Sequence, residues 1–149
     1  MSRVQIFAVG SHGKSIAKGS EDVNGILFGA SGVKHVSLII TINELNPEHW
    51  NIVPAGDSRD LFYIQHTDSG KWAFAPENPH EGSFVLATSA ISRRSVWRIK
   101  IHNGDEKSIH LRDNERLLWG IESIHAESEV KLKTGETDEM NRWKFERKV

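Results

Sequence analysis

Apolar and polar residues alternate along short stretches of this chain, and the stretches return at a nearly constant spacing. Three of them begin at tryptophans, Trp50, Trp97 and Trp143, which lie 47 and 46 residues apart. Apolar residues then follow at every second position, as in Trp97-Arg-Ile99-Lys-Ile101. Alternation with a period of two residues is typical of a half-buried β-strand. The pattern therefore predicts one strand-rich unit that occurs three times, with each tryptophan in the core.

Each unit contains three further stretches of this kind upstream of its tryptophan. They lie at residues 4–8, 25–28 and 38–40 in the first unit, 62–66, 71–75 and 84–88 in the second, and 108–111, 117–121 and 130–134 in the third. Turn residues such as Asp68-Ser-Gly70 separate them. Three copies of four strands predict an all-β fold, a β-trefoil, because a propeller needs at least four blades. We expect one domain over residues 1–149, with units at 1–56, 57–103 and 104–149.

The first unit is longer than the others by about a dozen residues. We assign the extra length to residues 10–24, a glycine-rich stretch too irregular for a strand, between the first and second strands. A second irregular feature is the turn over residues 30–36, which presents Lys34 before the third strand. Repeat proteins often carry function where the copies differ, although a tolerated surface insertion fits both segments as well. No helix is predicted, and residues 136–142 are expected to form a loop with at most one turn.

Composition and charge exclude several classes of protein. Of the 149 residues, 38% are hydrophobic and 26% are charged, as in ordinary globular domains. The net charge is −1 and the basic residues are scattered, so neither nucleic acid nor a membrane surface is an expected partner. There is no cysteine, and the N-terminal residues lack the pattern of a signal peptide. The expected location is cytoplasmic.

Chemistry that would indicate an enzyme or a metal site is missing from the sequence pattern. The eight histidines stand at residues 12, 35, 49, 66, 80, 102, 110 and 125. No two of them have the i, i+2 or i, i+4 spacing that places two ligands on one face of a strand or helix. No nucleophile-elbow motif marks a serine as activated. We therefore predict no metal, no cofactor and no catalytic residues.

Two segments resemble a known group of proteins. Residues 129–133 (Glu-Val-Lys-Leu-Lys) and 141–149 (Asn-Arg-Trp-Lys-Phe-Glu-Arg-Lys-Val) are similar to the C-terminus of small mushroom β-trefoil proteins, and residues 47–56 resemble the end of their first unit. This family includes serine-protease inhibitors, cysteine-protease inhibitors of the mycocypin type and ricin-B-like lectins. Its shared motifs are mostly core-forming, so they bear more on fold than on function. The resemblance implies a protein of fungal defence whose partner is a protease or a glycan.

The inhibitor hypothesis is the main functional prediction. In the serine-protease inhibitors of this family, a loop of the first unit enters the protease cleft, and the Val-Lys-His-Val pattern at residues 33–36 is similar to the segment before their third strand. The resemblance implies a rigid protease-binding loop made of Ser31, Gly32, Val33, Lys34 and His35. Lys34 would enter the acidic specificity pocket of a trypsin-like protease. The longer preceding loop departs from the family and leaves open which loop inserts.

The alternative is a carbohydrate-binding lectin. Trp72 and Trp119 stand outside the core series, and each follows a turn acid, Asp68 or Asp113. In mushroom lectins similar to this chain, a tryptophan near the position of Trp72 lines the sugar site, since an aromatic ring stacks on the apolar face of a sugar. Packing in a second layer would explain both tryptophans equally well. The ricin-type glutamine two residues before the core tryptophan is replaced in this chain by Glu48, Ser95 and Asn141.

Overall fold

The computed structural model describes residues 2–11, 14–21, 27–28, 34–35, 38–43, 48–125 and 128–147. Its strands are β1 (Ser2–Ala8), β2 (Ser15–Glu21), β3 (Leu27–Phe28), β4 (Lys34–His35), β5 (Leu38–Asn43), β6 (Trp50–Pro54), β7 (Leu61–His66), β8 (Trp72–Phe74), β9 (Leu86–Thr88), β10 (Val96–Ile101), β11 (Glu106–Leu111), β12 (Asn114–Gly120), β13 (Lys131–Lys133) and β14 (Trp143–Arg147). Three short 3-10 helices are η1 (Val9–Ser11), η2 (Arg93–Ser95) and η3 (Glu139–Asn141). The turn expected within residues 136–142 is η3. No helix in these ranges is long and apolar enough to cross a membrane.

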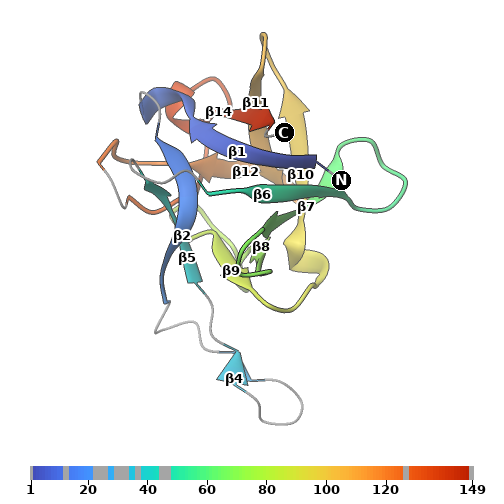
Figure 1. Cartoon of the computed structure of the whole chain (residues 1–149). Coiled ribbons are helices and arrows are strands. Elements are labelled where there is room, and N and C mark those ends of the chain that lie inside the picture. Colours follow the sequence, from blue (N-terminus) through green and yellow to red (C-terminus); the bar gives the residue numbers. More distant parts are fainter. Residues whose placement is uncertain are drawn as a thin grey trace.

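Six strands close into a barrel. Each is antiparallel to the next in the order β1, β6, β7, β10, β11 and β14, and β14 pairs again with β1. Figure 1 shows β1, β6 and β7 side by side across this barrel. The pairs β2–β5, β8–β9 and β12–β13 form three further hairpins. A six-stranded barrel with three additional hairpins is a β-trefoil, which confirms the predicted fold class.

A closed ring of backbone hydrogen bonds joins the three hairpins. The amide of Ile40 donates to the carbonyl of Val85 at 3.1 Å, Val85 donates to Val130 at 2.9 Å, and Val130 donates back to Ile40 at 2.8 Å. These residues are spaced 45 apart in the chain, and all three are fully buried. Since a buried amide or carbonyl without a partner costs about 1–3 kcal/mol, each hairpin needs the other two in place.

The three recurring tryptophans tie the barrel to the hairpins. The Nε1 atoms of Trp50, Trp97 and Trp143 donate to the backbone carbonyls of residues 16, 73 and 119, at 3.2, 3.0 and 3.1 Å respectively. All three indoles are fully buried. A tryptophan suits this position because it combines a large apolar body with a single hydrogen-bond donor. The core role predicted for the series is confirmed.

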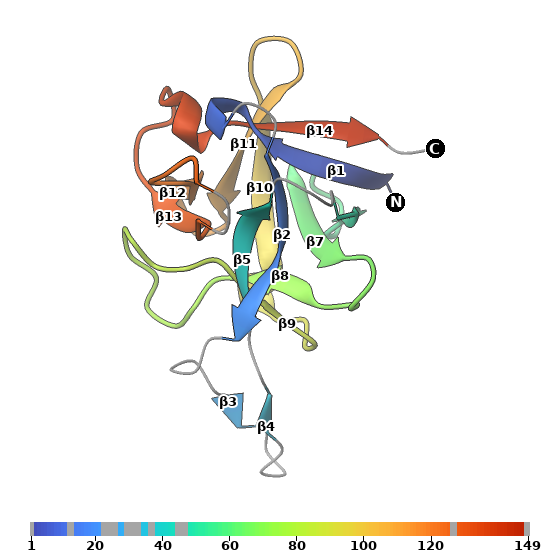
Figure 2. The same ribbon diagram turned by 60° about the vertical axis from the view of Figure 1, so that its left-hand side comes forward.

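The predicted position of the second strand in the first unit is wrong. That strand is β2, which lies inside the segment assigned to an irregular insertion, whereas Leu27 and Phe28 form β3, which pairs with β4. Because Ile16 is the only large apolar residue of β2, the segment shows no clear alternation, and pairing with β1 and β5 stabilises it. The extra residues therefore lie between β2 and β5. Figure 2 shows β3 and β4 beyond the ends of these two strands, away from the barrel.

Replacing a core tryptophan should be far more costly than replacing Trp72. Trp97→Phe removes the donor to the carbonyl of Ala73 and leaves space in a closed core. We expect the free energy of unfolding, measured by urea denaturation, to fall by about 2–4 kcal/mol. Trp72→Phe is the matched control because its side chain is partly exposed, and it should cost less than about 1 kcal/mol. Equal losses for the two variants would contradict the core assignment.

Candidate functional site

The strand registers show which positions of the second and third units are equivalent. Gln65 pairs with Trp72 between β7 and β8, and His110 pairs with Leu118 between β11 and β12. On the other side of the same strands, Tyr63 pairs with β6 and Ser108 with β10. Tyr63 and Trp72 in the second unit thus correspond to Ser108 and Leu118 in the third. The second unit therefore carries two aromatic rings at these positions, whereas the third unit carries a buried serine and a buried leucine.

Tyr63 and Trp72 form a partly exposed aromatic pair on the second unit. Their ring centroids lie 5.8 Å apart with an interplanar angle of 75°, so the rings meet edge to face. Both side chains are partly exposed. All five tryptophans of the chain lie in the described ranges, and the other four are 0% exposed. Trp72 is therefore the one tryptophan whose ring is accessible from solvent.

The turn between β7 and β8 places a carboxylate on the same hairpin as this ring. Asp68 is exposed in that turn. The amide of Gly70 donates to the carbonyl of His66 at 2.9 Å, and the amide of Ser69 donates to His66 Nδ1 at 3.2 Å. Gly70 has a φ of +73°, which favours glycine. Asp68 and Trp72 therefore lie on the same hairpin, in its turn and at the start of its second strand. We call Tyr63, Asp68 and Trp72 the aromatic face.

The second predicted pair, Asp113 and Trp119, does not form such a surface. Trp119 is fully buried and makes edge-to-face contacts with Trp97 and Trp143, at centroid distances of 5.2 and 6.4 Å. Of the two readings of Trp119, packing in the core is the one that the structure bears out. Its equivalent in the second unit is Ala73, one residue beyond Trp72, and a shift of one residue moves a strand side chain to the opposite face. Asp113 is exposed and pairs with an arginine of η2, whose hydrogen bond lowers the pKa of the carboxyl.

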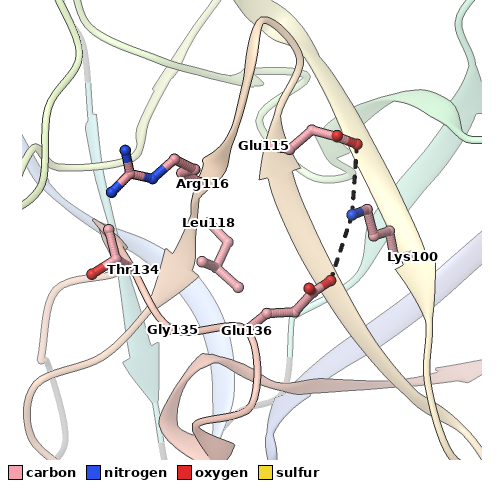
Figure 3. Close-up of a pocket in the computed structure, with 7 residues that line it drawn as sticks. All are labelled: Lys100, Glu115, Arg116, Leu118, Thr134, Gly135 and Glu136. Carbon is pink, nitrogen blue, oxygen red and sulfur yellow. Dashed lines mark ion pairs between the residues drawn. The ribbon is translucent and has the colours of Figure 1, made fainter.

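The equivalent surface of the third unit contains a pocket of about 410 Å³ (Figure 3). We call it the polar pocket, and its lining residues are Lys100, Glu115, Arg116, Leu118, Thr134, Gly135 and Glu136. Lys100 Nζ lies 3.6 Å from a carboxylate oxygen of Glu115 and 3.6 Å from one of Glu136, so it bridges the two acids. The lining includes no aromatic residue. This pocket presents hydrogen-bonding groups and charge rather than a stacking surface.

Asn141 fixes the loop that forms one wall of the polar pocket. Its Nδ2 donates to the carbonyls of Thr134 and Gly135 at 3.1 and 2.9 Å. A Cβ at Gly120 would lie 1.9 Å from Asn141 Oδ1, so this close approach requires glycine. Asn141 stands where the ricin-type repeat has glutamine. In the other two units Glu48 contacts His66, and Ser95 accepts from the amide of Ser92 at the start of η2, so these positions also hold local structure.

Two histidines that sequence spacing did not single out lie against the polar pocket. His102 and His110 both contact Glu136, with Nε2 to Oε1 distances of 3.7 and 3.4 Å. Burial is the first cause that lowers the pKa of each imidazole below its usual value. Both side chains are therefore neutral at neutral pH. No spacing rule for one strand or helix finds this pair, because His102 directly follows β10 and His110 lies in the neighbouring β11.

Most of the predicted protease-binding loop lies outside the described residues. This applies to Ser31, Gly32 and Val33. Lys34 and His35 form β4, where they pair with Phe28 and Leu27 of β3.

Comparison with known proteins supports the fold. No model of a protein family matches the chain, and no curated protein matches its sequence. Among solved structures, the agglutinin of Rhizoctonia solani is 13% identical with a TM-score of 0.76, over 99% of this chain and 95% of that one. The ricin B-like lectin of Macrolepiota procera, solved in complex with lactose, is 14% identical with a TM-score of 0.72, over 98% and 95%. The designed threefold symmetric protein ThreeFoil is 16% identical with a TM-score of 0.74, over 97% of both chains.

The exposure of the tryptophans predicts a simple fluorescence result. Iodide should quench only the emission of Trp72, because the other four indoles are fully buried. In Trp72→Phe the remaining emission should shift to the blue and lose almost all sensitivity to iodide. Quenching of similar size in this variant and in the wild type would show that a second tryptophan is accessible.

Proposed function

We propose that this protein is a carbohydrate-binding protein that holds a glycan on the aromatic face of its second unit. The observation that carries the proposal is the exposure of Trp72 in a chain that buries its four other tryptophans completely. Tyrosine and tryptophan, each with a large apolar ring and one polar group, are enriched at binding interfaces. The fold resemblance to an agglutinin and to a lactose-bound lectin supports the same reading.

The aromatic face has the two kinds of group that a sugar needs. The apolar C–H face of a pyranose stacks on the indole of Trp72, whose orientation is held by its edge-to-face contact with Tyr63. Sugar hydroxyls donate hydrogen bonds to the exposed carboxylate of Asp68. Because the turn that carries Asp68 is held by its own hydrogen bonds, little ordering is required on binding. The proposed activity is binding without catalysis.

The polar pocket is a weaker candidate for the same role. Its lining has no ring on which a sugar could stack, and its lysine is already bridged by two carboxylates. A sugar would have to compete with these ion pairs. The aromatic face is therefore the better candidate for the sugar-binding site.

Substitution of Trp72 tests the proposal on a glycan array followed by titration of the best-binding glycan. Trp72→Ala should weaken binding tenfold or more, because the stacking contact is worth at least about 1.4 kcal/mol. Phe84→Ala is the matched control, since Phe84 is a partly exposed aromatic residue outside the aromatic face, and it should bind like the wild type. An array without signal, or equal binding by Trp72→Ala and the wild type, would reject this site.

Protease inhibition is a second candidate, favoured by the position of β4. This strand lies away from the barrel (Figure 2), and Lys34 is one of its two residues. Lys34→Glu should abolish inhibition of a trypsin-like protease because an acidic specificity pocket repels a carboxylate. Lys34→Arg keeps the charge and should retain inhibition. Wild-type protein that leaves trypsin-like proteases fully active would remove this candidate.

A further inference from the structure

Two imidazoles and one carboxylate converge beside the polar pocket. His102 directly follows β10, His110 lies in β11, and Glu136 belongs to the loop between β13 and β14. Glu136 Oε1 lies 3.7 Å from His102 Nε2 and 3.4 Å from His110 Nε2. The three ligand atoms all lie within 4.8 Å of one another. A tetrahedral zinc ion with bonds of about 2.0–2.1 Å places its ligand atoms about 3.4 Å apart, so small side-chain shifts complete the geometry.

The hydrogen bonds of His110 prepare it as a ligand. Its Nδ1 lies 2.7 Å from the backbone carbonyl of Glu115. A carbonyl only accepts, so Nδ1 carries the proton and Nε2 keeps its lone pair, directed toward Glu136 and Ser108. Metal-binding histidines usually donate their second ring nitrogen to a carbonyl or carboxylate in this way. The side chain is 1% exposed, so the ring is held in this orientation.

The hydroxyl of Ser108 lies between the two imidazoles and hydrogen-bonds to both. Its Oγ lies 2.7 Å from His102 Nε2 and 2.6 Å from His110 Nε2. Since His110 Nε2 accepts, the hydroxyl donates to it and in turn accepts from His102 Nε2. To bind a metal, His102 shifts its proton to Nδ1 and the hydroxyl of Ser108 rotates. This tautomer change breaks the N–H bond at His102 Nε2 and forms one at Nδ1 by proton exchange with solvent, so the ring stays neutral and both Nε2 lone pairs become available to the ion.

We infer that His102, His110 and Glu136 form a binding site for a divalent transition-metal ion of the zinc type. Two imidazoles and one carboxylate suit this class of ion, and three protein ligands leave a fourth position open. Because Glu136 lines the polar pocket, the open position faces that pocket, where water or a ligand oxygen can occupy it. The site does not depend on glycan binding at the aromatic face.

Lys100 competes with the metal for Glu136. Its Nζ lies 3.6 Å from Glu136 Oε1, the same oxygen that faces the two imidazoles. When an ion binds, Lys100 retains its other partner, Glu115, at 3.6 Å. Removal of this positive charge should therefore strengthen metal binding. A structural role for the cluster alone would not produce this effect.

Isothermal titration of the full chain with zinc chloride in a non-chelating buffer tests the site. We expect one ion per chain, and at least tenfold weaker binding for His102→Ala and for Glu136→Gln. Both side chains are partly exposed, so these variants separate ligation from folding better than substitution of the buried His110. Lys100→Gln should bind at least threefold more tightly. Cobalt(II) should give the visible absorption of a four-coordinate site, and this absorption should be lost in His102→Ala.

Exposed histidines outside the cluster provide the matched controls. His80→Ala and His125→Ala should bind zinc like the wild type. The inference is overturned if no heat is seen at millimolar zinc, or if His102→Ala and Glu136→Gln bind as the wild type does. It is also overturned if binding is lost on substitution of His80 or His125. Circular dichroism and urea denaturation verify that each variant is folded.

Discussion

The ring of backbone hydrogen bonds among residues 40, 85 and 130 is the constraint on which the rest of the structure depends. It joins three hairpins that come from different parts of the chain, at positions without access to water. Each of the three tryptophan indoles then connects one hairpin to the barrel. Because every buried donor in this arrangement needs its partner, the strand registers are set together. Outward-facing side chains carry no such constraint and can differ among the units.

The differences among equivalent outward positions create the candidate sites. Tyr63 and Trp72 fill the surface of the second unit, while the corresponding surface of the third unit has Ser108 and Leu118 and contains a pocket. The smaller side chains leave room for two imidazoles and the loop that carries Glu136. One scaffold thus presents two partly exposed aromatic rings in one unit and a cluster of two imidazoles, a carboxylate and a lysine in another. A threefold scaffold in which each unit is held by the same bonds tolerates this divergence.

Sequence periodicity predicted the fold because a strand with one buried face has an apolar residue at every second position. The three tryptophans begin strands of this kind. It missed β2, whose single large apolar residue, Ile16, shows no alternation and whose pairing partners are distant in the chain. It left open whether Trp119 binds a sugar or packs in a second layer, because a shift of one residue along a strand cannot be seen without the register. The cluster of His102, His110 and Glu136 was invisible for a related reason. His102 directly follows β10, His110 lies in the neighbouring β11 and Glu136 in a later loop, and the folded barrel brings the three together.

The central claim is that Trp72 contacts the glycan and that the other four tryptophans do not. The most direct test is an NMR titration in which a glycan that the protein binds is added to ¹⁵N-labelled protein. The five indole Nε1–H signals are followed. The account predicts that the Trp72 signal shifts with saturation, while the signals of Trp50, Trp97, Trp119 and Trp143 stay in place because those indoles are buried. A saturable glycan that leaves the Trp72 signal unmoved would contradict it.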